Sequence, residues 1–225
     1  MAVEFVQSGS NSGSSVTSLA VTLTGVTAGN SIAVAVMQSQ ATVATYSVTD
    51  DVDGGSYTSQ ITNDANSGRV SELFTFADCT GGDPEVTVTA SASRVFAIAV
   101  IEVSGAGSSL TISTDSQDTS GGATKYAAAS SGFSPTADSL CIAAFTFNAG
   151  TASNTVGSGY TSAYNSAAHP IGLCQYQEFS TLQANHRPEM TVGTTFRVGP
   201  AVCMFIEAGV AVASTPSRTL LGVGI

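Results

Sequence analysis

The sequence predicts an all-β protein, a two-sheet antiparallel β-sandwich built from two pseudo-repeats of about 100 residues. Three observations lead to this prediction. Apolar and polar residues alternate along many short segments, clusters of glycine, asparagine and aspartate separate these segments, and one series of segments occurs twice. No stretch of ten or more residues carries the apolar stripe of an amphipathic helix.

Period-two alternation marks the individual strands. Residues 19–24, 32–37 and 86–89 alternate in this way and are rich in valine and threonine, as half-buried strands are. Two longer runs, 95–103 and 201–208, are apolar at almost every position, which is typical of strands covered on both faces. We therefore expect each of these runs to lie centrally in a sheet, one run in each half of the chain.

The repeat is clearest in the segment Pro84-Glu85-Val86-Thr87-Val88, which recurs as Pro188-Glu189-Met190-Thr191-Val192, 104 positions later. Further matches follow the same order at nearly the same spacing, and such a pattern usually signals architecture rather than chemistry. The remaining matched segments are residues 27–32 and 136–140, 56–59 and 159–162, and the apolar runs 96–103 and 202–206.

The pseudo-repeats extend over residues 16–105 and 124–208, and we expect them to build one sandwich, with two separate domains as the alternative. Residues 1–15 are predicted to be an N-terminal arm with a serine- and glycine-rich hinge, and residues 209–225 a C-terminal arm. Exposed apolar arms are costly for a monomer, so we expect them to contact other subunits. The predicted interface residues are Val3, Phe5, Leu220, Leu221, Val223 and Ile225.

Charge disfavours two classes of partner. The net charge is −10, and the chain has one lysine and five scattered arginines. Binding to phosphate groups needs clustered basic residues, so neither nucleic acid nor an anionic membrane is an expected partner. The longest apolar runs are too short to span a bilayer, and the first residues lack the features of a signal peptide. We therefore expect synthesis in a host cytoplasm.

Four cysteines, Cys79, Cys141, Cys174 and Cys203, are predicted to be free. Three of them lie in apolar segments, where a cysteine acts as a small hydrophobic residue. Disulfides are less expected after synthesis in a cytoplasm, and no pair has the short spacing of a zinc site. The sequence gives no reason to expect a cofactor.

One acidic cluster is a weak candidate for calcium binding. Asp50, Asp51 and Asp53 precede two glycines, and carboxylate oxygens in a glycine turn suit Ca²⁺. The spacing of an EF-hand is absent, however. A solvated hairpin loop, in which aspartate and glycine supply the turn geometry, explains the cluster better.

The residues that an enzyme would need are not arranged in a known pattern. His169 and His186 are the only histidines, and no serine lies in a nucleophile elbow. Glu85 and Glu189 are repeat partners that could form a glycosidase pair, but their positions at the starts of strands indicate surface residues. We therefore predict no catalytic residues and no enzymatic activity.

Sugar binding is an alternative that depends on exposed aromatic residues. The chain has no tryptophan, but Tyr160 and Tyr164 flank a loop rich in glycine and serine. Tyrosines at such positions can form a platform for a sugar ring, and they also commonly cap the edge of a sandwich with the hydroxyl in water. These two residues are the glycan candidates.

A longer pattern resembles a group of known proteins. Residues 19–32 are followed by Val48-Thr49-Asp50, by Tyr57-Thr58, and then by the strands 85–89 and 97–103. This series resembles uncharacterised β-sandwich proteins of phages and environmental bacteria, over roughly residues 16–208. The resemblance implies a jelly-roll or lectin-like sandwich of the kind found in virion or surface proteins, and it implies no catalytic residues.

The expected function is structural. A surface poor in charge, two arms and the resemblance together indicate a bacteriophage virion protein, most simply a capsid decoration or cement-type subunit located in the virion. Its expected partners are a major capsid protein, or another virion protein, and its own copies in a homo-oligomer. The alternatives are a carbohydrate-binding module of a tail fibre or surface protein, and an extracellular filament subunit assembled by strand exchange.

Overall fold

The computed structural model describes residues 2–39, 42–64, 68–106, 110–118, 125–147, 154–166, 172–192 and 198–207. The prediction of an all-β protein is confirmed: within these ranges every regular element is a β-strand, and every strand pair is antiparallel. The same part of the chain holds no helix that could cross a membrane.

The first half of the chain forms one large sheet with the strand order β1-β6-β2-β5-β4, and β3 also pairs with β6. Its central strand β6 contains the apolar run 95–103, as predicted for a strand covered on both faces. The strands are β1 (Glu4–Thr22), β2 (Ser31–Gln38), β3 (Tyr46–Asp50), β4 (Thr58–Asn63), β5 (Val70–Phe76) and β6 (Glu85–Ser104).

The second half forms a large sheet with the order β11-β12-β9-β14-β7 and a small sheet with the order β10-β13-β8. The apolar strand β14 lies between β9 and β7, again inside its sheet. The strands are β7 (Thr111–Asp118), β8 (Lys125–Ala127), β9 (Ser139–Phe147), β10 (Asn154–Val156), β11 (Thr161–Ser166), β12 (Gly172–Phe179), β13 (Glu189–Val192) and β14 (Val198–Glu207).

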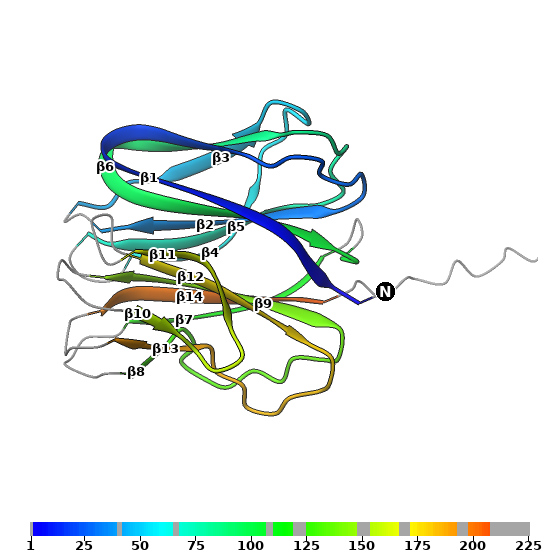
Figure 1. Ribbon diagram of the computed structural model, residues 1–225. Coiled ribbons are helices and arrows are strands. Elements are labelled where there is room, and N and C mark those ends of the chain that lie inside the picture. Colours follow the sequence, from blue (N-terminus) through cyan, green and yellow to red (C-terminus); the bar gives the residue numbers. More distant parts are fainter. Residues whose placement is uncertain are drawn as a thin grey trace, which may run out of the picture.

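Two long strands, β1 and β6, contribute to two layers each. The early part of β1 pairs with the late part of β6, and beyond register shifts between residues 13 and 18 the late part of β1 pairs with the early part of β6. Strand β2 pairs with the late part of β6 and β3 with its early part. Figure 1 shows the result as a stack of layers, with β3 at one end and the small sheet of β8, β10 and β13 at the other.

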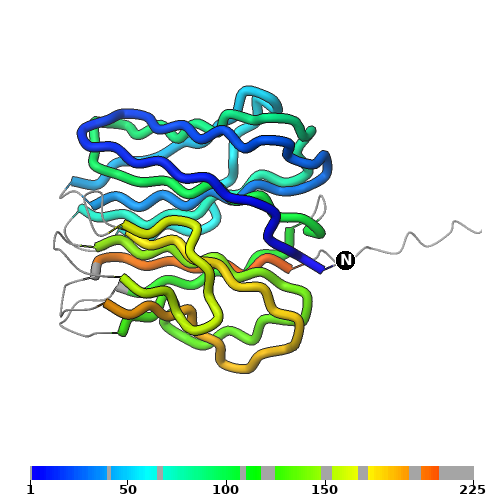
Figure 2. The backbone as a smooth tube through the Cα atoms, viewed as in Figure 1, coloured from blue at the N-terminus to red at the C-terminus, as the bar shows by residue number. Residues whose placement is uncertain are grey.

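Three hydrophobic clusters separate these layers. The first cluster draws only on residues 19–100, with Val16, Tyr46 and Phe76 packed against it, and the third only on residues 126–205. The middle cluster lies between the two large sheets and takes side chains from both halves. Figure 2 shows the two halves as separate parts of the stack, the first in blue to green and the second in green to orange.

Strand alternation explains how one sheet serves two clusters. In β2 the side chains of Ile32, Val34 and Val36 enter the first cluster, while Ala33 and Ala35 enter the middle cluster. All five are buried, since both faces of the sheet are covered. The middle cluster contains many alanines, and small side chains allow two sheets to approach closely.

The prediction that residues 1–15 form an N-terminal arm with a hinge was wrong. Residues 4–13 form the first part of β1, in which Glu4 pairs with Ser104 and Phe5 with Val103. Val3 is 1% exposed within the middle cluster, and the ring of Phe5 stacks on Tyr176 with centroids 4.0 Å apart. Both predicted interface residues at this end therefore pack on the protein itself.

Close packing explains the small residues in the first part of β1. A Cβ atom on Gly9 would lie 2.6 Å from Val21 Cγ1, closer than such atoms approach. The side chain of Asn11 donates to the carbonyl oxygen of Ala20 at 2.9 Å, so the early part of β1 is bonded to its own late part. Glycine and short polar residues are needed where the strand closes over the first cluster.

Candidate functional site

The acidic loop after β3 binds its own backbone. The Asp50 carboxylate accepts the N–H groups of Val52 and Asp53 at 2.9 and 2.6 Å, which is the pattern of an aspartate-stabilised turn. Asp51 accepts the N–H of Glu85 at 2.8 Å, and Asp53 accepts the N–H of Thr80 at 3.1 Å. The three side chains of the calcium candidate thus hold different loop segments.

This geometry favours a structural role for the cluster. Carboxylates that bind Ca²⁺ converge on one point, whereas Asp51 and Asp53 are bonded to different segments of the chain, at Glu85 and Thr80. Within the described ranges, no group of three or more histidine, cysteine, aspartate or glutamate side chains is placed to hold a metal ion.

Two further carboxylates hold the turn that precedes a central strand. Glu102 is fully buried and accepts the N–H of Thr27 at 2.9 Å, the side-chain amide of Asn30 at 2.6 Å and that of Gln7 at 2.7 Å. In the second half, Glu207 accepts the N–H of Thr136 at 3.3 Å. These glutamates were not singled out from the sequence, although each ends an apolar strand.

Asp115 on β7 organises the loop after β8. Its carboxylate accepts the N–H groups of Ser116, Ser130 and Ser131 at 2.7–3.0 Å, together with both serine hydroxyls of that loop. Partial burial alone would raise the pKa of Asp115, but the bonds from Ser131, Ser116 and Ser130 outweigh it and lower the pKa below its usual value. The ionised form is therefore the form that holds the loop.

His186 is partly buried and packs against aromatic rings. Its Nε2 is 2.8 Å from the hydroxyl of Tyr160, which donates to Cys141 Sγ at 3.3 Å. The rings of Phe179 and Phe205 face it edge-on, with centroids 4.7 and 6.2 Å away. Burial lowers the pKa of His186, with an opposing effect of Glu189, so the neutral ring is favoured here.

The contacts of the two glycan candidates argue against the predicted sugar platform. Tyr160 is 7% exposed and belongs to the third hydrophobic cluster. Tyr164 is partly buried and packs against the middle cluster. A sugar ring needs an exposed aromatic face, which Tyr160 does not present, whereas Tyr164 keeps part of its side chain exposed.

Each of the four cysteines is free and buried, as expected. Burial raises the pKa of Cys174 to about 12, and it also raises the pKa of Cys141 and of Cys203. A buried neutral thiol is unreactive because the thiolate is the nucleophile.

Glu85 and Glu189 lie in layers at opposite ends of the stack (Figure 1) and do not form a catalytic pair. Glu85 is exposed at the start of β6, and Glu189 at the start of β13 lies 3.6 Å from the ammonium group of Lys125. The predicted residues His169, Leu220, Leu221, Val223 and Ile225 lie outside the described residues.

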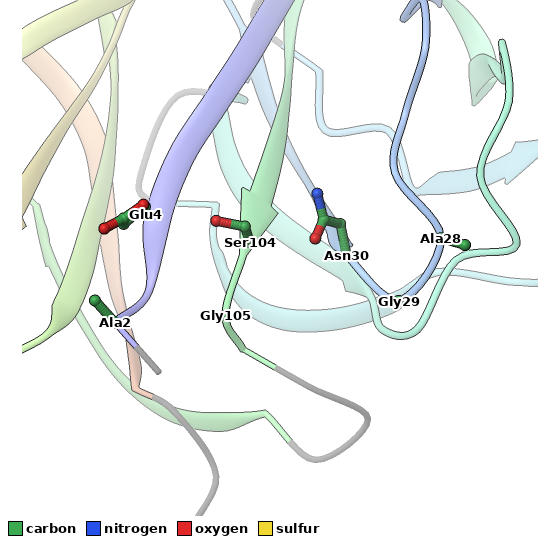
Figure 3. A pocket seen from close by; sticks show the side chains of 7 residues that line it. All are labelled: Ala2, Glu4, Ala28, Gly29, Asn30, Ser104 and Gly105. Carbon is green, nitrogen blue, oxygen red and sulfur yellow. The ribbon is translucent and has the colours of Figure 1, made fainter.

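One surface depression lies beside the beginning of β1 and the end of β6. Its volume is about 520 Å³, within the range of roughly 300–1,000 Å³ that ligand sites have. Gly105 has a φ of +75°, and a Cβ atom there would lie 1.8 Å from the carbonyl oxygen of Ala2. Glycine is therefore required where the two backbones meet. The lining residues, shown in Figure 3, are Ala2, Glu4, Ala28, Gly29, Asn30, Ser104 and Gly105.

In comparisons with known proteins, the chain matches no family model and no curated protein.

Proposed function

We propose that this protein is a structural subunit of a virus particle, a decoration or cement-type protein of a bacteriophage that binds a shell and its own copies. The observation that carries the proposal is the use of acidic groups. Asp50, Asp51, Asp53, Asp115 and Glu102 all accept hydrogen bonds from the protein's own loops. This arrangement stiffens a scaffold, whereas catalysis needs such groups to face a substrate.

The outer face of the layer formed by β3, the late part of β1 and the early part of β6 supports the same proposal. In one row across three strands, Thr89 of β6 pairs with Ser18 of β1 and with Ser47 of β3, and all three residues are exposed. In the next row, Thr87 pairs with Ala20 and Thr49. The next row pairs Thr22 with Glu85, whose carboxylate is the charged group of these three rows. A face so poor in charge suits broad contacts with a protein shell, where many copies add their small individual affinities.

The direct test is mass spectrometry of virus particles. The particles are purified on a density gradient from a phage-containing sample in which this gene is present. We expect peptides of this chain in the particle fraction, in a fixed ratio to the major shell protein. Peptides found only in the soluble fraction, with none in intact particles, would refute the proposal.

We also infer that the two halves are copies of one jelly-roll-like unit. If the bends in β1 and β6 are counted as strand ends, the first half has eight strands in two packed layers, as a jelly roll has. The strand order β1-β6-β2-β5-β4 corresponds element by element to β7-β14-β9-β12-β11. The set β1, β6 and β3 corresponds likewise to β8, β13 and β10.

Local irregularities support the duplication more strongly than the strand order does. A register shift follows Ser59 in the β4–β5 pair, and a register shift follows Ser162 in the β11–β12 pair, 103 positions later. Isolated bridges join Val26 to Gly82 and Phe133 to His186. Unrelated sheets are not expected to share bulges and bridges at nearly the same spacing.

Matched backbone conformations add to this support. Gly81 and Asn185, which are 104 positions apart, both have positive φ, at +88° and +54°. Gly29 and Asp138, in the turns before β2 and β9, have φ of +85° and +63°. Asparagine and aspartate are the residues that best replace glycine in this region.

A further inference from the structure

The depression beside β1 has the features of a docking site for a peptide segment. Its lining is mostly apolar and contains the small residues Ala2, Ala28 and Gly105, while Glu4 is exposed at its edge. Figure 3 shows these residues at the end of the stack, where β1 begins, β6 ends and the turn before β2 passes. An open apolar hollow with one carboxylate suits an extended segment that carries apolar side chains and one cation.

The chain itself reaches this place. Strand β14 ends at Glu207, which pairs with Ser139 of β9. Asp138, the residue before Ser139, accepts the N–H of Val3 with its backbone carbonyl at 3.0 Å. Val3 follows Ala2, which lines the depression. Figure 1 shows the end of β14 and the start of β1 on the same side of the molecule. Residues 208–225 therefore continue from a point close to the depression.

The composition of residues 208–225 complements this site. Arg218 is their only charged side chain, and after Thr219 come the apolar residues Leu220 and Leu221. The edge of the depression carries negative charge from Glu4, and Asp138 and Glu207 lie nearby. The described basic residues lie elsewhere, with Lys125 beside Glu189 and Arg187 bonded to the carbonyl of Ala129.

We propose that the depression binds residues 218–221 of the same chain, with Leu220 and Leu221 against Ala2 and Ala28, and Arg218 beside Glu4. An extended chain covers up to roughly 3.3–3.6 Å per residue, so the connection from Glu207 has ample length. A tethered segment has a high effective concentration at a nearby site, which favours its own chain over a neighbour. This inference concerns the chain before assembly, so its failure would leave the proposed virion role intact.

Trypsin tests the proposal in the full-length protein, because cleavage after Arg218 releases residues 219–225 and changes the mass. We expect this cleavage to be slower by about tenfold or more than in a synthetic peptide of residues 208–225, since a docked segment must first open. The protection should not change between low and high protein concentration. Equal rates in protein and peptide would overturn the proposal, and protection that is lost on dilution would reassign the site to a second copy.

Two variants locate the site. Ala28→Trp fills the depression and should restore rapid cleavage at Arg218, whereas the control Val52→Trp, at a position 41% exposed on the β3–β4 turn, should leave the rate unchanged. Leu220→Ser with Leu221→Ser removes the apolar side chains without touching the described fold and should also restore rapid cleavage. If both sets of variants keep the protection, the segment does not bind in this depression.

Discussion

At the scale of single residues, carboxylates determine where the loops lie. Asp115 binds two serines of the loop after β8, and Glu102 binds the turn before β2. In each case an ionised or polar oxygen satisfies backbone N–H groups that would otherwise lack partners. The geometry of the loop after β8 therefore depends on pH through Asp115.

Asp115→Asn should destabilise the protein at neutral pH by about 1–2 kcal/mol, a value reduced from that of a buried charged hydrogen bond because the side chain is partly exposed. The folded state lowers the pKa of Asp115, so its stabilisation is present above the pKa of the unfolded chain and is lost as pH falls through the folded pKa. Urea unfolding at pH 7 and at pH 3 measures this. The same destabilisation at both values would contradict the assignment.

Glu72→Gln should have the opposite effect. Burial raises the pKa of Glu72, and the hydroxyls of Ser59 and Thr62 offset only part of that rise. A raised pKa means that the protonated side chain stabilises the fold at low pH and that this contribution is lost as pH rises through the folded pKa. Glutamine keeps the acceptor oxygen without the charge, so the melting temperature should rise at pH 7 and match the wild type near pH 3. A lower melting temperature at pH 7 would contradict this reasoning.

At the scale of elements, the two large sheets are held together by small side chains. Ala33, Ala35, Ala97 and Ala99 face the other sheet and are buried. Their short side chains set the distance between the sheets, so this interface tolerates added volume poorly.

Ala35→Leu should therefore destabilise the protein by about 1–3 kcal/mol, since the extra atoms push the sheets apart or force strained side chains. The control is Ala20→Leu on the outer face of β1, where the side chain is partly exposed and the effect should stay within about 0.5 kcal/mol. Denaturant unfolding measures both. Equal effects at the two positions would show that the interface has spare room.

Element prediction from sequence succeeded where side chains follow the strand period and failed where backbone contacts dominate. The alternation in residues 32–37 predicted the strand correctly, but it predicted one buried face, whereas β2 is buried on both faces. Residues 4–13 look like a linker because Gly9 and Gly13 carry no side chains, yet these glycines are needed for close packing. Tyr160 flanks a glycine-rich loop, and only its contacts with His186 and Cys141 reveal that it is buried. Such contacts join residues far apart in the sequence and leave no local signal.

At the scale of the whole molecule, the middle cluster links the two halves. Ile101 comes from the first half and Ile142 from the second, and both are fully buried in this cluster. Neither half can expose its large sheet without losing the apolar contacts of the other, so we expect the halves to unfold together.

Ile101→Ala and Ile142→Ala should each destabilise the protein by about 2–5 kcal/mol. Each variant should also retain a single unfolding transition in calorimetry, because both side chains support the same interface. The calorimetric and van't Hoff enthalpies should agree in the wild type and in both variants. Two separate transitions in either variant would show that the halves are thermodynamically independent.

The burial of the four thiols has a consequence for the conditions in which this protein can exist. No covalent cross-link holds the described fold together, and its four cysteines are free and buried. Neither glutathione nor dissolved oxygen has a bond to break or an accessible sulfur to attack. The four thiols are therefore expected to keep the same chemical state in a reducing and in an oxidising medium.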